Sequence, residues 1–236
     1  MSDDYTRLDL KIDVFDQYAQ HARALTQLTP PQLIEAILQE FGELEFLGHV
    51  PDHYALQYVN DGRPLQVDQP LQQQVKNDTR LRLVEIDAEL PKGTKRPSQH
   101  IYLREQSSGL AYKLHWLPAI VGRPDSNQPF NDRVAVNLES YPTGLRVSRR
   151  HFTISERGEQ FYIERMSPNP TSLMHNGERK ELSNKPQSLQ YGDLIHLDRS
   201  RITFKFIIRP EIASLPEANV DETDIIEVDE SEGTSH

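Results

Sequence analysis

Apolar and polar residues alternate near the start of the chain, where Leu8, Leu10, Ile12 and Val14 are separated by charged residues. An apolar residue at every second position is typical of a strand with one buried face. A polar stretch follows and predicts a turn, and residues 23–28 are predicted to form the returning strand. The pattern therefore indicates an antiparallel pair of strands.

The next segment has the start and stop signals of a helix. Thr29 is suited to the N-cap, Pro30 to the first helical position, and Gln32 to the third, where its amide completes a capping box. Gly42 is a helix-ending residue. Between these signals the apolar residues recur at helical spacing: Leu33, Ile34, Ile37, Leu38 and Phe41.

A second strand pair is predicted at 53–59 and 64–67, because Asn60-Asp61-Gly62 between them is a hairpin signal. A short helical turn near 69–75 and a last strand at 79–86 complete the block. This element order, within about 80 residues, resembles the ubiquitin-like β-grasp fold.

Residues 1–88 are therefore expected to form an α+β ubiquitin-like β-grasp domain. No Gly-Gly ends the block, and the chain runs on through Ile86. The resemblance thus implies a docking module for a second protein partner and not a conjugated tag.

Residues 89–100 combine two prolines, one glycine and three basic residues, which predicts an exposed, semi-stiff linker. A long loop inside a single domain is the alternative. After Pro210 there are nine acidic residues and no Lys or Arg, so 210–236 is predicted to be an acidic, disordered tail.

From residue 101 to residue 209 short strand patterns recur with turn signals between them, which predicts an all-β sandwich. The predicted strands are 101–104, 112–121, 134–138, 151–155, 160–165, 194–197 and 201–208. The chain is thus predicted to be multi-domain, with a β-grasp domain followed by a sandwich.

Five short motifs occur in a fixed order within the sandwich: Gly122-Arg123, Ser148 to His151, Ser167 to Thr171, Asn176-Gly177 and Gly192-Asp193. Each is weak alone. Together they resemble the forkhead-associated (FHA) domain, which binds phosphothreonine with loops at one end of a sandwich.

The resemblance implies a role for each matching residue. Arg123 is expected to contact phosphate, Ser148 to donate its hydroxyl, and Arg149 to make a backbone or phosphate contact. Asn169 is expected to hold the main chain of the bound peptide. Aligning backwards from the later Asn-Gly pair instead places Thr171 in the role of the asparagine.

Other matching residues are expected to shape the site without touching ligand. His151 resembles a histidine that braces the loops, and Gly122, Asn176 and Gly177 are expected to be structural. Arg150 is expected to be solvated.

The charges agree with this interpretation once the tail is set aside. The net charge is −10, but the tail holds nine of the 36 acids, which leaves 27 against 26 Lys and Arg. Arg146, Arg149 and Arg150 lie around Ser148 and favour an anion. This cluster is short and has no interleaved aromatic residues, so no nucleic acid partner is expected, and nucleic acid remains a minor alternative.

The other function classes find little support. There is no cysteine, the histidines lack metal-ligand spacing, and no phosphate-cradling glycine loop or nucleophile elbow occurs. We therefore expect no enzyme activity, no metal and no cofactor. No signal peptide or membrane span is visible, which predicts a cytoplasmic protein.

The expected function is a phosphothreonine-dependent adaptor in Ser/Thr kinase signalling, downstream of such a kinase. The alternative is a structural subunit of a larger assembly, such as a secretion or signalling complex, whose FHA-like fold no longer binds phosphate.

The tail adds one hypothesis. Thr223 has Ile226 three residues after it, so phosphorylated Thr223 is a candidate intramolecular ligand. Ile225-Ile226-Glu227-Val228, flanked by acids, also resembles short strands that add to the edge of ubiquitin-like folds. An uninvolved, solubilising tail is the alternative.

Overall fold

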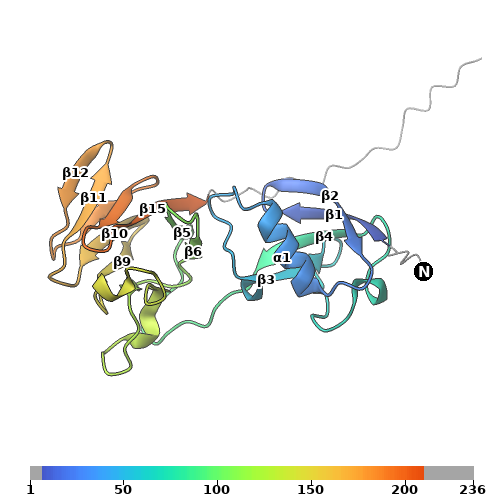
Figure 1. Cartoon of the computed structure of the whole chain (residues 1–236), viewed down its shortest axis with the longest axis horizontal. Coiled ribbons are helices and arrows are strands. Elements are labelled where there is room, and N and C mark those ends of the chain that lie inside the picture. The colour runs from blue at the N-terminus through green and yellow to red at the C-terminus, as the bar shows by residue number, and fades with distance from the viewer. Residues whose placement is uncertain (1–6, 210–236) are drawn as a thin grey trace, which may run out of the picture.

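The computed structural model describes residues 7–209, which form two packed units joined by a surface segment (Figure 1). Within this range no helix is both long and apolar enough to cross a membrane. The first unit contains β1 (Arg7–Val14), β2 (Gln17–Leu25), α1 (Pro30–Glu40), β3 (Tyr54–Tyr58) and β4 (Arg80–Glu85), with short 3₁₀ turns at Pro51–His53 and Leu71–Gln73.

The first unit has the predicted β-grasp arrangement. Its sheet has the order β2-β1-β4-β3, with β1 antiparallel to β2 and parallel to β4. Helix α1 begins as predicted, because the Thr29 amide donates to Gln32 Oε1 at 2.9 Å and Pro30 takes the first position. The buried side chains of α1 and the sheet form one core around Leu10, Ile37 and Leu81.

The predicted strand at 64–67 is wrong, since this segment forms only an isolated bridge between Gln57 and Pro64. Pro64 has no amide to donate to a ladder. The side-chain amide of Gln74 then bonds both the N–H (2.6 Å) and the C=O (3.0 Å) of Gln66. The Leu65 amide still donates to the Leu56 carbonyl of β3 at 2.9 Å, but from Gln66 on the backbone is bonded by a side chain and no longer by the strand.

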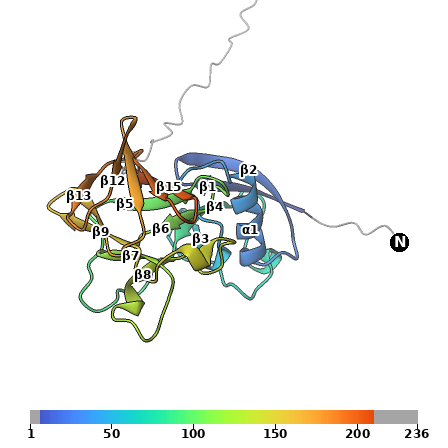
Figure 2. The ribbon, with the colours of Figure 1, turned by 60° about the vertical axis from the view of Figure 1, so that its left-hand side comes forward.

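The second unit is an all-β sandwich, as predicted, and its two sheets lie face to face (Figure 2). Its strands are β5 (His100–Glu105), β6 (Ala111–Lys113), β7 (Ala119–Gly122), β8 (Val134–Asn137), β9 (Phe152–Arg157), β10 (Gln160–Arg165), β11 (Thr171–His175), β12 (Glu178–Glu181), β13 (Gln187–Leu189), β14 (Leu194–Leu197) and β15 (Ile202–Arg209). Short 3₁₀ turns lie at Asn131–Arg133 and Gly144–Arg146.

One sheet has the order β13-β10-β9-β7-β8 and the other β12-β11-β14-β15-β5-β6. Their inner faces meet in one core that includes Phe152, Phe161 and Phe206, all 2% exposed or less. The long strand predicted at 112–121 is wrong, because the chain changes sheets within it: β6 pairs with β5, whereas β7 pairs with β9.

The segment between the units is exposed and lies along the sandwich. Backbone hydrogen bonds join Lys95 and Leu117 in both directions, at 2.9 and 2.8 Å. The Lys95 ammonium also pairs with Glu156 at 2.7 Å, and Arg133 donates to the Lys92 carbonyl at 2.8 Å. These contacts restrict how freely the segment moves.

The two units meet at a paired cluster of charges. Glu85 of β4, with a side chain 7% exposed, faces Lys113 at 2.7 Å and Arg209 at 3.2 Å, and the Tyr102 hydroxyl donates to it at 2.9 Å. Arg104 of β5 adds a hydrogen bond to the Leu44 carbonyl at 2.7 Å. The units therefore have a defined mutual orientation.

Candidate functional site

Three loops at one end of the sandwich bring the predicted site residues together. Arg123 begins the β7–β8 loop, Ser148 lies in the β8–β9 loop, and Asn169 lies in the β10–β11 loop. The Asn169 side-chain amide donates to Ser148 Oγ at 2.8 Å and to the Arg146 carbonyl at 3.4 Å. Arg123 Nε donates to the Val147 carbonyl at 2.8 Å. The loops are thus joined directly to one another.

Gly122 permits this convergence. A Cβ at Gly122 would lie 2.5 Å from the Arg149 carbonyl oxygen and 2.7 Å from that of Ser148. Distances under 3.0 Å are not accommodated by backbone atoms, so a side chain here would push the β8–β9 loop away. The expectation that Gly122 is structural agrees with this close approach.

Arg123 and Ser148 have donors that no group among the described residues uses. Among residues 7–209, neither η-nitrogen of Arg123 has a hydrogen-bond or ion-pair partner, although Nε is fixed. Ser148 Oγ accepts from Asn169 and has no acceptor of its own within that range, so its proton is free to be donated. An anion placed between the two side chains would receive three preoriented donors.

His151 supports the site from the buried interior of the sandwich. It is 1% exposed, and burial lowers its pKa to about 4, so the imidazole is neutral at pH 7. Its Nδ1 accepts the Ser148 amide at 3.2 Å, which leaves the proton on Nε2 for the hydroxyl of Thr171 at 3.0 Å. This histidine therefore joins the loop of Ser148 to the first residue of β11.

Thr171 does not reach the surface of the site. The residue is fully buried, and its hydroxyl contacts His151. Of the two alignments that the sequence allows, the one that gives Asn169 the peptide-holding role fits the geometry, since Asn169 is half-buried and bonded to Ser148. The prediction that Thr171 contacts ligand is therefore corrected: its buried hydroxyl supports the site by bonding His151.

Comparison with known protein families decides what this domain is. The model of the FHA domain matches residues 120–198. This segment is an FHA domain. It covers the converging loops described above, and no catalytic domain is found.

Solved structures and curated proteins add little to the FHA assignment. The FHA domain of human APLF in complex with an XRCC1 bisphospho peptide is 22% identical, with a TM-score of 0.35, and the match covers 46% of this chain and 97% of that chain. Mycobacterium tuberculosis EmbR in complex with a low affinity phosphopeptide is 24% identical, with a TM-score of 0.37, covering 49% of this chain and 26% of that chain. A design based on ubiquitin is 17% identical, with a TM-score of 0.29, covering 36% of this chain and 96% of the design. A search of curated proteins gives no match.

The remaining arginines of the FHA domain have different surroundings. Arg149 is 57% exposed and pairs with Asp125 at 2.8 Å, so part of its charge is already balanced. Arg150 was expected to be solvated, and this is wrong. It is half-buried and donates to carbonyls of the β7–β8 loop and its neighbour: Arg123 (3.3 Å), Gln128 (3.5 Å), Pro129 (3.2 Å) and Arg149 (2.9 Å).

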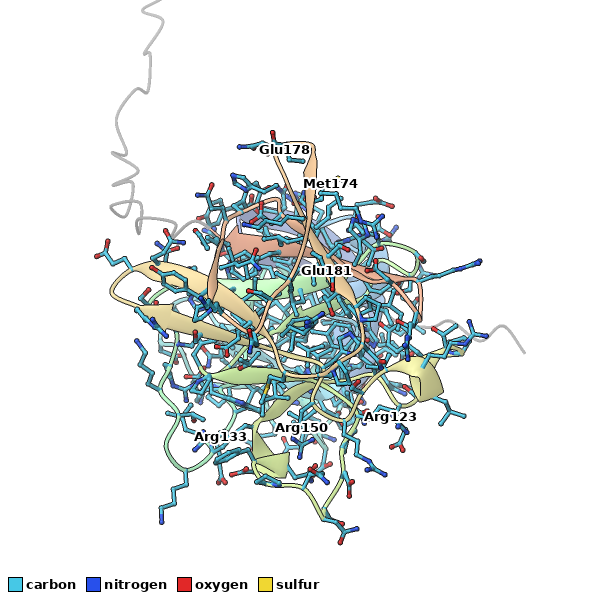
Figure 3. All side chains as sticks on the ribbon, turned by 90° about the vertical axis from the view of Figure 1, so that its left-hand side faces the viewer. Arg123, Arg133, Arg150, Met174, Glu178 and Glu181 are labelled. Atoms are coloured by element: carbon cyan, nitrogen blue, oxygen red, sulfur yellow. The ribbon has the colours of Figure 1, made fainter. Side chains whose placement is uncertain are left out.

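Arg150 is the site-supporting residue that sequence reasoning missed. Its contacts fix a polar loop of the FHA domain next to Arg123, and Figure 3 shows both side chains at the same end of the sandwich. A signal for this role exists in the sequence, namely the long polar segment at residues 125–133. The carbonyls of such a loop need hydrogen-bond donors from nearby side chains if the loop is to be ordered.

Asn176 and Gly177 are not part of this site, which corrects their assignment as structural residues within it. They form the turn between β11 and β12, with φ angles of 48° and 83°, whereas Thr171 at the opposite end of β11 contacts His151. Figure 3 places Glu178, which follows this turn, far from Arg123. Thr223 lies outside the described residues.

Proposed function

We propose that the FHA domain of this chain binds phosphothreonine in partner proteins through Arg123, Ser148 and Asn169. The observation that carries the proposal is a set of donors without a partner in residues 7–209: the η-nitrogens of Arg123, whose Nε is held by the carbonyl of Val147, and the hydroxyl proton of the next residue, Ser148. A phosphate supplies the acceptors for them, since it has three strong acceptor oxygens and nearly two negative charges at pH 7.

The expected hydrogen-bond energies are large enough for micromolar binding of a phosphopeptide. A hydrogen bond to a charged group contributes about 1.5–3 kcal/mol. Three such bonds approach the roughly 8 kcal/mol that corresponds to micromolar affinity. Asn169 adds orientation, because its fixed amide has further capacity to bond a peptide main chain.

The test is binding of a degenerate phosphothreonine peptide library to the full chain, compared with Arg123→Ala. Loss of the guanidinium is expected to weaken binding by about 100-fold, the equivalent of two charge-assisted bonds at the lower end of their range. Arg157→Ala is the matched control, because Arg157 lies at the far end of β9 from His151. This control is expected to bind like the parent chain.

Two outcomes would reject the proposal. If the parent chain selects no phosphopeptide, the alternative of a structural subunit with an inactive FHA fold is favoured. If Arg157→Ala weakens binding as much as Arg123→Ala, the attraction is non-specific charge and not a site.

The wider role follows from two modules held together. We propose that the chain is an adaptor that acts after a Ser/Thr kinase has phosphorylated its partner, and that residues 1–88 bind a second protein. The paired charges between the units support this, because they hold the two modules in one orientation.

A further inference from the structure

Strand β2 is a free edge of the first sheet, whose order is β2-β1-β4-β3. The direction of its backbone groups follows from β1. Lys11 N–H bonds the Thr79 carbonyl, and Asp9 C=O accepts the Asp78 amide, so both residues of β1 point toward β4. Their partners on β2, His21 and Arg23, therefore direct N–H and C=O away from β1, toward the open edge.

No group among residues 7–209 bonds these outward amides of β2. An exposed row of unpaired N–H and C=O groups is a template for another strand. The two faces of β2 differ: Ala22 and Ala24 pack on the core side, whereas His21 and Arg23 are exposed on the opposite side.

The exposed face of the sheet beside β2 is positively charged. Residues of the same parity on β1, β2 and β4, with Asp78 just before β4, contribute five basic side chains against the three acids Asp9, Asp13 and Asp78, of which Asp13 is buried. Four of the basic side chains pair with these acids at 3.0 to 3.7 Å, and Arg7 is the fifth: Lys11, Arg23, Arg80 and Arg82 are paired. The face thus has an excess of two positive charges, whereas the acids and bases of the chain nearly balance once the tail is set aside. The edge is therefore suited to an acidic strand.

The described chain also ends near this strand. The guanidinium of Arg209, the last described residue, lies 4.4 Å from the ring of Phe15. Phe15 is in the turn that leads from β1 into β2. The backbone of Arg209 pairs with His100 of β5, so residues 210–236 follow from a point about one arginine side chain away from the turn into β2.

We infer that residues 224–229 of the chain's own tail, Asp-Ile-Ile-Glu-Val-Asp, add to β2 as a further strand. Alternate residues of a strand face opposite sides. Ile226 and Val228 then lie on the core side with Ala22 and Ala24. Glu227 and Asp229 lie on the positively charged face. Ile225 also lies on the charged face and is the only apolar residue of 224–229 on that side.

The length of the connection fits. Fifteen residues separate Arg209 from Ile225, and a flexible chain of that length has an r.m.s. span of about 21 Å. Strand β2, with nine residues, is about 30 Å long. The tail thus reaches the middle of β2 without being stretched, and its effective concentration there is on the order of millimolar.

The experiment measures amide hydrogen exchange of His21 and Arg23 by NMR in the full chain and in Ile226→Lys/Val228→Lys. A strand of about 0.1 mM affinity held at a millimolar effective concentration slows exchange about tenfold. The double variant is expected to lose this protection, and 0.5 M salt to reduce it, since the attraction is partly ionic. Ile212→Lys, also in the tail, is the matched control and retains protection.

Three results would overturn the inference. One is equal exchange of His21 and Arg23 in the parent chain and the double variant. Another is loss of protection in Ile212→Lys as well, which indicates a non-specific charge effect. The third is a difference between the parent chain and the double variant that is confined to the amides of Arg123, Ser148 and Asn169, because the tail then lies at the loop end of the FHA domain and not on β2. None of these results depends on whether the FHA domain binds an external phosphopeptide.

Discussion

The junction between the two units and the loop end of the FHA domain both contain arginine, but the arginines are used in opposite ways. Arg209 at the junction pairs with Glu85 at 3.2 Å, and its guanidinium lies 4.4 to 5.6 Å from the rings of Phe15, Phe46 and Tyr102. The side chain of Arg123 at the loop end makes one hydrogen bond, through Nε, and its two η-nitrogens have no partner in the part of the chain that the structure describes.

The difference separates a structural cation from one available to ligand. Burying an unpaired charge is unfavourable, so a buried arginine is balanced by its own protein. An arginine whose guanidinium has no acidic partner lies where it is partly exposed, so that water can solvate the charge until a ligand binds. The residue type does not tell a structural arginine from a ligand-binding one, whereas the groups that its guanidinium contacts do.

The largest effect is expected from breaking the junction. Glu85→Ala leaves Lys113 and Arg209 without their carboxylate in a poorly solvated place, which costs about 3–5 kcal/mol of unfolding free energy. Urea unfolding followed by fluorescence of Trp116, the single tryptophan, measures it. Glu35→Ala, exposed on α1, is the control with little change. A loss below 1 kcal/mol at Glu85 would mean that water solvates the junction well.

A smaller effect is expected from pH at the loop end. Burial lowers the pKa of His151 from 6.5 to about 4, so the folded form favours the neutral ring, and its contribution is present above pH 6.5 and lost as pH falls toward 4. Between pH 7 and pH 5 this amounts to about 2 kcal/mol of unfolding free energy. Urea unfolding at both pH values is expected to show a correspondingly shallower dependence for His151→Gln. Equal dependence in the two chains would show that His151 is not the titrating group.

The smallest expected change in stability is the one that best separates Arg123 from Arg209. Arg123→Ala is expected to change the unfolding free energy by at most about 0.5 kcal/mol, because only one bond to the Val147 carbonyl is lost and the tip has no partner among the described residues. The same urea titration measures it. A loss of 2 kcal/mol or more would place Arg123 with Arg209, as a structural cation.

Much of the fold was predictable because local signals agreed with the final contacts. The helix start at Thr29 and Pro30 is set by capping chemistry that acts within four residues. Strands β10 and β14 lie within the predicted bounds because glycine turns and alternating side chains mark them. Strand β12 was missed because all four of its residues are polar and exposed, which leaves no periodicity to detect.

The site was predictable as a set of residues but not as an arrangement. The motif order identified Arg123, Ser148 and Asn169, and these do converge. The roles of Thr171 and Arg150 depend on which atoms the loops bring near them, namely the buried ring of His151 and the carbonyls of the polar loop. Such contacts join segments about 20 residues apart and have no local pattern.

The position of β15 has a consequence for synthesis of the chain. This last strand lies between β14 and β5, so the first strand of the sandwich has no partner on that side until Arg209 has been made. At about 5–20 residues per second, the intervening stretch of roughly 100 residues takes about 5–20 s to emerge. The last strand of the first unit ends at Glu85, so every strand of that unit has been made before this interval begins. The nascent sandwich, by contrast, waits with an open edge at β5, which is the period when a chaperone would protect it most.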